Sequence, residues 1–441
     1  MGEQFDKAAS LNEIVKAARQ CRRGVSGKDG VMEFYITALG SGEALREKIL
    51  DGRYRARPGT TVEIWRPKHR IATAPWFRDR VWQRSMCNNG VYADLTRGFI
   101  RNNMACQTGK GTDMAIRTVI AMLQELYREK PGADIFVKHL DVKRYFPSTP
   151  QREIKALDRR KITEPLFIPY LDEIIDMQQD PRPEEEIAED LHGKRGTGLG
   201  SQINQLNQVA LPDELDHEVI KICPHYIRFN DDFLLLSHDR QVVEAASETI
   251  RRWLEGKGLV MTDKGGVFRA EDGFYFLRKK FILKPTGRIV IRLHPKAMAE
   301  ERQTLRNLKR LEDEGRRTRE QTEVHYQSWV SGAEYAGDGP IRTMDKFYTN
   351  LFRRKPRYKR KRRYLYGDRS DTEGAHPPAG ARERPAPEED REVGGDAGIC
   401  RHDDGRGHRG GGRQCTAECL TGSRSSTTGA TGPVTGCATP W

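Results

Sequence analysis

The sequence predicts an α+β protein built around an antiparallel sheet, and three observations support this fold class. Two apolar segments, 226–229 and 233–236, flank a short polar turn, which is the pattern of a β-hairpin. The apolar run 136–142 is typical of a buried strand. Residues 112–129 place their apolar side chains on one helical face, and residues 295–330 form a long, highly charged helical stretch.

The remaining elements follow from local patterns along the chain. Ser10 is a suitable N-cap for an opening helix, because apolar residues recur at helical spacing from Leu11 to Cys21. Residues 61–65 and 71–74 alternate like two strands joined by a turn. Further helices are expected over 42–50, 166–177, 201–221 (interrupted by Pro212) and 243–257, and further strands over 274–293.

The charge balance indicates a polyanionic partner. The 441 residues carry 76 Lys and Arg against 63 Asp and Glu, a formal net charge of +13. Residues 367–441 hold nine basic and twelve acidic residues, so residues 1–366 carry about +16. Such an excess favours nucleic acid first and an anionic membrane second. The membrane alternative is weakened because no apolar run approaches the ~18 residues of a spanning helix and no leader pattern opens the chain. We therefore expect a cytoplasmic protein with no membrane partner.

Two C-terminal segments differ in composition from the rest of the chain. Residues 353–364 are a basic run with two interleaved tyrosines, either a solvated charge block or a phosphate-binding arm, and the basic body favours the arm. Residues 367–441 are rich in Gly, Arg, Pro, Thr and Ser, so we expect a disordered, low-complexity tail. The Cys and His residues of this tail match no standard zinc spacing, and its composition resembles a GC-rich frame read out of phase. The four cysteines of the body predict reduced, mostly buried thiols.

Acidic residues on two apolar strands carry the sharpest functional signal. Asp141 lies near the end of the run 136–142, and Asp231 and Asp232 occupy the predicted hairpin turn. Each has an ordinary explanation, because Asn230 and Asp231 make a good turn and Asp141 suits a helix N-cap or a salt bridge. Together, however, carboxylates from neighbouring strands are what two Mg²⁺ ions about 4 Å apart require for nucleotidyl transfer. The pattern therefore predicts a two-metal site at these three carboxylates.

Around these carboxylates the chain resembles the reverse-transcriptase family of bacterial and phage type. Residues 140–146 (LDVKRYF) look like the family's first catalytic motif, and Phe229–Asp232 looks like its Tyr-x-Asp-Asp box with Phe in place of Tyr. The resemblance implies a right-hand polymerase with fingers, an antiparallel-sheet palm and a helical thumb. It also implies that the backbone carbonyl of Val142 is a further metal ligand and that two Mg²⁺ ions, replaceable by Mn²⁺, are the cofactor.

Basic residues upstream are similar to the family's triphosphate-binding residues. Lys68 and Arg70, followed by residues 77–81, resemble the fingers hairpin that grips the incoming nucleotide. Residues 105–112 (ACQTGKGT) look like the next fingers motif, which makes Lys110 a second triphosphate contact at a helix N-terminus. A P-loop is rejected because the upstream glycine spacing of that motif is absent.

Two further motifs of the resemblance concern the nucleotide pocket. The aromatic pair Tyr145 and Phe146 contains the expected steric gate against a ribose 2′-hydroxyl, with Tyr145 preferred and Phe146 as the alternative, since one of the two must face the core. Residues 196–205 occupy the place of the motif that lines the pocket, and Gln205 is its expected nucleotide contact. The pattern Leu-Gly-x-x-x-Asn-Gln resembles that of diversity-generating retroelements, with Asn204 in place of Ser.

Downstream segments extend the resemblance in family order. Residues 259–264 match the palm motif whose lysine, here Lys264, can protonate the leaving pyrophosphate. Residues 273–277 resemble the primer-grip hairpin, and residues 295–352 resemble the thumb. The implied domains are 1–39 (N-terminal helical extension), 40–135 (fingers), 136–293 (palm, with an insertion at 151–195), 294–352 (thumb), 353–366 (basic arm) and 367–441 (tail).

The resemblance implies an RNA-directed DNA polymerase whose partners are an RNA template, a DNA or RNA primer and dNTPs. A diversity-generating retroelement, with a small basic accessory protein, is the preferred biological role. An antiphage-defence or group II intron-like reverse transcriptase is the alternative. Two further hypotheses assign the protein a different activity. One is an RNA-dependent RNA polymerase, which shares the carboxylates, and the other is a non-catalytic RNA-binding protein on a polymerase scaffold, which does not require them.

Overall fold

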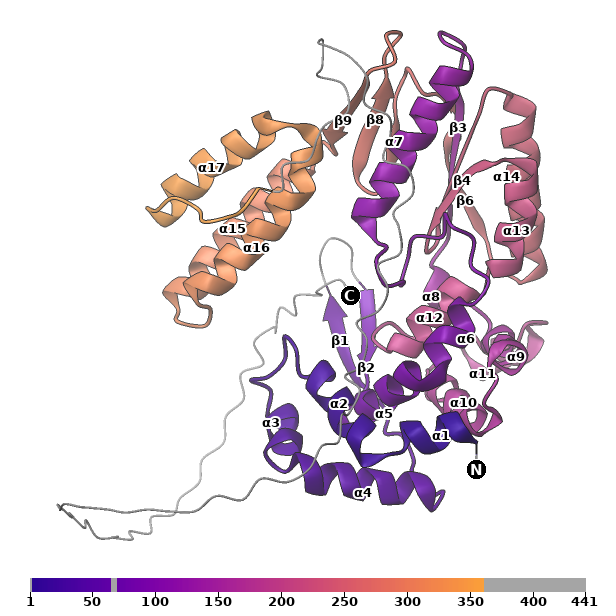
Figure 1. Ribbon diagram of the computed structural model, residues 1–441, viewed down its shortest axis with the longest axis vertical. Helices are drawn as coiled ribbons and strands as arrows, with labels where there is room; N and C mark the ends of the chain where they lie inside the picture. The colour runs from indigo at the N-terminus through magenta and orange to yellow at the C-terminus, as the bar shows by residue number, and fades with distance from the viewer. Residues whose placement is uncertain (1, 65–69, 361–441) are drawn as a thin grey trace, which may run out of the picture. The chain divides into compact units, whose positions relative to one another are not determined.

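The computed structural model describes residues 2–64 and 70–360; residues 1, 65–69 and 361–441 lie outside the described part. Lys68, the predicted tail and the last six residues of the predicted basic arm therefore lie outside it. The described chain mixes helices with three antiparallel sheets, which confirms the predicted mixture of helix and antiparallel sheet (Figure 1). Within those residues we find no helix that combines the length and the apolar composition needed to cross a membrane.

A four-stranded antiparallel sheet with the strand order β4-β5-β3-β6 carries the predicted acidic residues. Its strands are β3 (Phe136–Val142), β4 (His225–Phe229), β5 (Asp232–Ser237) and β6 (Met261–Arg269). β3 lies in the interior of the sheet and pairs with β5 on one side and β6 on the other. The structure confirms both the predicted strand 136–142 and the predicted hairpin. β6 as a full strand was not predicted.

The side chains of this sheet alternate between two cores, as strand geometry requires. Leu140 and Val142 pack in one core with α13 (Asp213–Ile222) and α14 (Arg240–Gly256). Val137 packs in the other core with α7 (Thr112–Glu129) and with a second sheet of order β7-β8-β9. By the same alternation, Asp141 lies on the same face of the sheet as Val137. The strands of the second sheet are β7 (Phe274–Phe276), β8 (Lys279–Leu283) and β9 (Ile289–Leu293).

A third core joins the N-terminal helices to a later segment of the chain. Phe5, Trp82 and Phe167 meet there, with ring centroids 6.0–6.4 Å apart. Ser10 caps α2 by accepting a hydrogen bond from the Glu13 amide, as predicted. The elements of this core are α1 (Glu3–Ala8), α2 (Leu11–Cys21), α3 (Asp29–Ile36), α4 (Ala38–Leu50), α5 (Phe77–Met86), η1 (Cys87–Val91), α6 (Tyr92–Thr96), α9 (Gln151–Lys161), η2 (Pro165–Phe167), α10 (Ile168–Asp176) and α12 (Gln202–Ala210). Outside it lie β1 (Thr60–Ile64), β2 (Arg70–Ala74), α8 (Tyr145–Ser148) and α11 (Glu184–Glu189).

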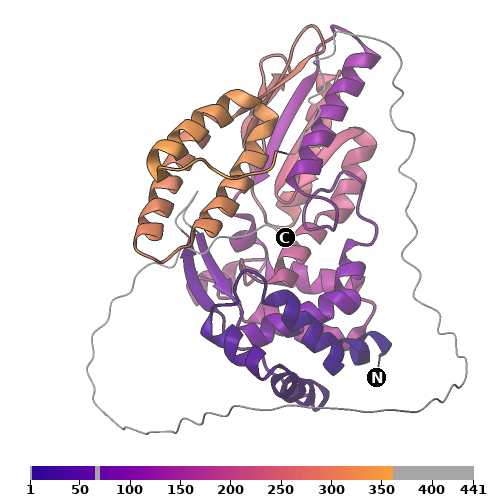
Figure 2. The same ribbon diagram turned by 60° about the vertical axis from the view of Figure 1, so that its left-hand side comes forward.

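The charged stretch predicted as helical is divided into separate helices with a core of their own. α15 (Ala297–Asp313) ends before a short loop, and a capping box of Thr318 and Gln321 starts α16 (Arg319–Ala333). After a single turn, η3 (Glu334–Ala336), α17 (Asp338–Phe352) follows. Both views show α15, α16 and α17 side by side (Figure 2). We refer to these three helices as the C-terminal helical unit.

The outer edge of β4 is covered by an irregular segment. The Arg228 amide donates to the Asn102 carbonyl (3.1 Å), and the Met104 amide donates to the Arg228 carbonyl (2.9 Å). Asn103 and Arg228 thereby form a parallel bridge. This pairing fixes residues 102–104, and the loop that follows them, beside the β4–β5 hairpin.

Candidate active site

The sheet brings the three predicted carboxylates together. Asp141 on β3 is the cross-strand partner of Asp232 on β5. The β4–β5 hairpin closes at the pair Phe229 and Asp232, which leaves Asn230 and Asp231 as a two-residue turn. Asn230 has φ of +58°, a left-handed conformation that Asn tolerates better than most residues. The turn thus places Asp231 directly beside the Asp141–Asp232 pair.

Two cationic or hydrogen-bonding side chains contact these carboxylates. The Lys264 ammonium lies 2.6 Å from Asp232 Oδ1 and 3.2 Å from Asp141 Oδ2, so it bridges the two strands. His139 Nε2 lies 3.0 Å from the same Asp232 oxygen, and the His139 side chain is only 9% exposed. Lys264 was predicted from sequence, whereas His139 was missed. The signal that pointed to His139 was its position on the same face as Asp141, two residues earlier in the strand.

The protonation equilibria of the site reflect its concentration of negative charge. Burial, with additional repulsion from Asp141 and Asp232, raises the pKa of Asp231 to about 6. Burial opposes ionisation of Asp232 as well, but hydrogen bonds from His139 and Lys264 outweigh it and hold the pKa of Asp232 below its usual value. Burial likewise acts against the charge of Lys264, yet the attraction of Asp232 and Asp141 raises the pKa of its ammonium. The site therefore favours a cation among its carboxylates.

The donor set fits a hard divalent cation. Mg²⁺ prefers carboxylate oxygens, and the side chains of Asp141 and Asp232 remain 25% and 24% exposed, so an ion can reach both. The Lys264 ammonium between them occupies a place where positive charge is stabilised. Elsewhere in the described chain, Glu125, Glu129 and His225 bring three ligand atoms within 4.8 Å of one another, but both glutamates are exposed.

A fully buried ion pair holds the turn between β4 and β5. Arg228 and Asp216 are both 0% exposed, and two guanidinium nitrogens of Arg228 donate to the Asp216 carboxylate at 2.7 and 2.6 Å. Arg228 also donates to the carbonyls of Asn230 (3.0 Å) and Val209 (2.9 Å). It thereby ties the turn to α12 and α13. Sequence reasoning missed this role, although an arginine inside the apolar run 226–229 was the available signal.

The structure places the two aromatic residues that follow Asp141 differently. Tyr145, the preferred gate residue, is only 3% exposed, and its hydroxyl donates to the Gln208 carbonyl at 2.8 Å. A ring held in this way faces the core and has no surface to offer a sugar. Phe146 is half-buried and meets Tyr145 edge-on, with ring centroids 6.1 Å apart. Phe146 is therefore the member of the pair that a ligand can reach.

The glycine-rich loop 196–201 lies against this aromatic segment. The Thr197 amide donates to the Phe146 carbonyl (3.1 Å), and the Gly196 amide donates to the Thr149 carbonyl (2.9 Å). On its other side the loop meets β2, because a Cβ on Gly200 would lie 2.5 Å from the Thr73 carbonyl oxygen. Gln205 follows on α12 with a half-buried side chain. Its role as a nucleotide contact stays a prediction.

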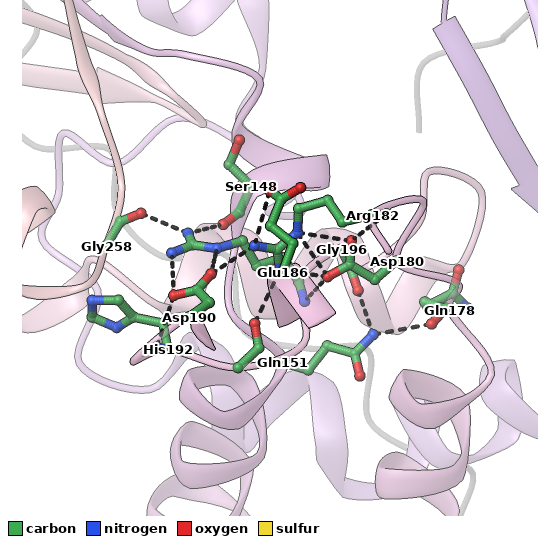
Figure 3. Close-up of polar contacts among 12 residues, drawn as sticks. Ser148, Gln151, Gln178, Asp180, Arg182, Glu186, Asp190, His192, Gly196 and Gly258 are labelled. Atoms are coloured by element: carbon green, nitrogen blue, oxygen red, sulfur yellow. Dashed lines mark hydrogen bonds and ion pairs between the residues drawn. The ribbon is translucent and has the colours of Figure 1, made fainter. Parts of the chain in front are cut away.

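A network of ion pairs holds the segment that leads into this loop (Figure 3). Asp180 pairs with Arg182 at 2.6 Å, and Asp190 pairs with both Arg182 (2.7 Å) and Arg195 (2.6 Å). Arg195 also donates to the Ser148 carbonyl (2.9 Å) and the Gly258 carbonyl (2.6 Å). Arg195 therefore connects the end of α8, the glycine-rich loop and the approach to β6. Figure 3 shows Ser148 and Gly258 reached by dashed contacts from this network.

The predicted triphosphate contacts are only partly described. Lys68 lies outside the described residues, and Arg70 is the first residue of β2, with a side chain that is not described. Lys110 directs its ammonium to the carbonyls of Arg101 (3.0 Å) and Asn103 (2.9 Å). Burial, with repulsion from Arg101, lowers the pKa of Lys110. Lys110 thus stabilises its own loop through these two hydrogen bonds, and its contact with a triphosphate stays a prediction.

Val142 ends β3 with a buried side chain, and the role of its carbonyl as a metal ligand likewise stays a prediction.

Comparison with known proteins yields matches among solved structures only. The chain matches no protein-family model and no curated protein. A telomerase from Candida albicans, solved in complex with a TWJ fragment of telomeric RNA, matches with 12% identity over 73% of this chain and 60% of that chain, at a TM-score of 0.39. Two apo telomerases from Candida tropicalis match as well. One, truncated from its C-terminal domain, shows 10% identity over 55% of this chain and 58% of that chain, at a TM-score of 0.38. The other shows 11% identity over 66% and 59%, at a TM-score of 0.40.

The chain thus spans about three fifths of the telomerase chains that it resembles. At these identities and TM-scores the likeness to telomerases supports no functional argument, so the functional conclusion rests on the residues of the site.

Proposed function

We propose that this protein is a template-directed nucleotidyltransferase of the reverse-transcriptase kind, which synthesises DNA on an RNA template. One observation carries the proposal: Asp141 and Asp232 are cross-strand partners, Asp231 adjoins them in a hairpin turn, and Lys264 bridges the pair. A purely structural turn needs no third carboxylate and no cation that bridges two strands. A site for nucleotidyl transfer needs both carboxylate strands in register.

The chain's own residues account for binding and proton chemistry. Asp141, Asp231 and Asp232 would hold two Mg²⁺ or Mn²⁺ ions, which when bound activate the 3′-hydroxyl and stabilise the leaving pyrophosphate. Lys264 keeps its proton because Asp232 and Asp141 raise the pKa of its ammonium, and it is the available general acid for the leaving group. His139 holds one oxygen of Asp232 and so orients that carboxylate.

Selection of the deoxyribose fits the geometry of Phe146. Its ring is the reachable member of the aromatic pair, and its carbonyl is bonded to Thr197 in the glycine-rich loop. Phe146 and this loop would form two walls of the nucleotide pocket. A ribose 2′-hydroxyl would clash with the ring, which favours dNTPs over rNTPs.

Primer extension on an RNA template tests the proposal. We expect dNTP incorporation in Mg²⁺ and a loss of about 10³-fold for Asp231→Asn, because metal stabilisation contributes several kcal/mol and each 1.36 kcal/mol is tenfold. Asp239→Asn, which alters only the exposed cap of α14, is the control and should keep full activity. Incorporation of rNTPs instead would indicate an RNA polymerase. RNA binding without any extension would indicate a non-catalytic protein.

The biological role that we propose is a diversity-generating retroelement, because residues 199–205 carry the Leu-Gly-x-x-x-Asn-Gln pattern. In that role a small basic accessory protein would be the partner. Sequencing of cDNA co-purified with the protein should show errors concentrated at template adenines. Faithful cDNA would favour the antiphage-defence or group II intron-like alternative.

A further inference from the structure

The residues that follow α17 return along the C-terminal helical unit as a fixed segment. We call residues 353–360 the strap. Arg354 forms a bidentate ion pair with Glu312 of α15, in which Nη2 donates to Oε2 at 2.9 Å. The Tyr358 hydroxyl donates to Asp345 of α17 at 2.7 Å. The backbone of Lys359 makes two hydrogen bonds with the Gln327 side chain of α16, at 2.8 and 2.5 Å.

Half-buried and exposed residues alternate along the strap. Arg354, Pro356 and Tyr358 are half-buried against the helices. The intervening residues are all basic and all exposed: Arg353, Lys355, Arg357 and Lys359. Arg353 is the left-handed C-cap of α17. From Lys355 to Lys359 the alternation is typical of an extended chain, in which every second side chain points outward at intervals of about 6.6 Å. Within the described chain, none of these four exposed side chains has a carboxylate in ion-pair contact.

A groove lies between the strap and α17. It has a volume of about 560 Å³, and its lining includes Asp345, Lys346, Asn350, Lys355, Pro356 and Tyr358. This volume falls in the ordinary range of small-ligand sites. Two ammonium groups, an aromatic ring and a proline face are thus close to amide and carboxylate acceptors. The Asp345 carboxylate already accepts from the hydroxyls of Tyr326 and Tyr358, so its charge is partly dispersed.

We propose that the strap and its groove bind single-stranded RNA, with the outward cations on successive phosphates and one unpaired base in the groove. This site rests on the proposed function, since a polymerase template supplies such a strand, but it lies on elements distinct from those of the carboxylate site. A cationic track beside an aromatic surface is the general design of single-strand binding. A duplex keeps its bases stacked and paired, and therefore has no free base for the groove. The rigid attachment of the strap means that binding does not require ordering of this segment.

Fluorescence anisotropy with the full-length protein tests the site. The probe is an oligouridylate RNA of about 16 nucleotides, titrated over a range of salt concentrations. Each single-strand phosphate contact contributes about 0.7 to the slope of log K against log salt, so Lys355→Gln/Arg357→Gln should reduce that slope by about 1.4. The charge-retaining exchange Lys355→Arg/Arg357→Lys should keep the slope.

The matched control is Lys28→Gln/Lys48→Gln, which removes two exposed charges from α4 and from the residue before α3. This control should leave the slope unchanged, and a blunt RNA–DNA duplex should bind wild type and strap variant equally. Three outcomes would overturn the proposal. The control variant could lose as much slope as the strap variant, or the duplex could lose as much binding as the single strand. The strap variant could also lose binding of an oligoglutamate peptide while it keeps binding of the RNA. Because the readout is binding, a protein without polymerase activity still gives a decisive result here.

Discussion

Arg228 and Asp216 determine how firmly the turn that carries Asp231 is held. Burying two charges is expensive, and the pair is stable only because its hydrogen-bonding capacity is nearly saturated by Asp216, Asn230, Val209 and the Tyr226 hydroxyl. The arrangement removes the torsional freedom of the residues just before Asp231. In this way Arg228, a residue buried beneath the turn, fixes the position of the Asp231 carboxylate.

Replacement of Asp216 by Asn should destabilise the protein by about 3–5 kcal/mol, because the Arg228 charge would stay buried without a partner. Urea unfolding measures the change. Asp176→Asn breaks the more exposed Lys155 pair and should have little effect. A small effect of Asp216→Asn would show that water reaches Arg228.

Asp158 is a buried carboxyl whose pKa shift makes protein stability depend on pH. It is 0% exposed, and burial raises its pKa to about 8, against a partial opposing effect of its hydrogen bond from Asn207. A carboxyl with a folded-state pKa above its unfolded value binds more protons when folded. Its contribution to stability is therefore complete at acidic pH and is lost as the pH rises from about 4 to about 8.

Asp158→Asn should remove this loss, because the amide stays neutral at every pH. Thermal unfolding midpoints at pH 5 and pH 9 should differ less for the variant than for wild type, with the variant more stable at pH 9. Glu189→Gln, at an exposed position, is the control. A wild-type pH profile in the Asn variant would contradict the assignment.

The aromatic pair after Asp141 gives a test at the level of single rings. Phe146→Ala should raise rNTP incorporation relative to dNTP incorporation in primer extension, since the reachable ring is lost. Tyr145→Phe should leave this ratio unchanged and lower stability by about 1 kcal/mol through loss of its hydrogen bond. The opposite pattern would restore Tyr145 as the gate.

At the scale of elements, local patterns predicted long regular segments well. The bounds of α7 and β3 agree with the predicted 112–129 and 136–142, because periodicity and apolar runs define them directly. The prediction of the three carboxylates followed from the strand 136–142 and the adjacent hairpin. The choice between Tyr145 and Phe146 did not, because Arg144 adopts φ of +50° and redirects the chain, so the alternation of β3 cannot be extrapolated past it. The network of Asp180, Asp190 and Arg195 was equally inaccessible, since it depends on a tertiary fold of loops.

The contact of the glycine-rich loop with β2 also belongs to this scale. Gly200 has φ of +126°, and a methyl group there would meet the Thr73 carbonyl. Gly200→Ala should therefore displace the loop and raise the KM for nucleotide. Gly193→Ala is the matched control, because it shares the positive φ (+68°) but faces open space. Equal KM values for the two variants would argue against the contact.

At the scale of the whole molecule, separate cores predict separate responses to damage. Leu305 lies in the core of the C-terminal helical unit, and Leu234 lies between the sheet and α7. Leu305→Ala should destabilise its own unit by about 2–5 kcal/mol. Hydrogen exchange should then quicken in α15–α17 while β3–β5 stay protected, and Leu234→Ala should show the reverse. Uniform acceleration in both variants would indicate one cooperative unit.

The interior place of β3 has a consequence for synthesis of the chain. β3 ends at Val142, but its neighbour β5 begins at Asp232 and its other neighbour, β6, comes later still. At ~5–20 residues per second, the ribosome delivers the first partner roughly 5–20 s after β3 has emerged. During that interval an apolar strand has no neighbour on either edge, and unpaired strand edges are prone to aggregation. Soluble yield should therefore depend on chaperone supply during translation more than on the stability of the finished protein.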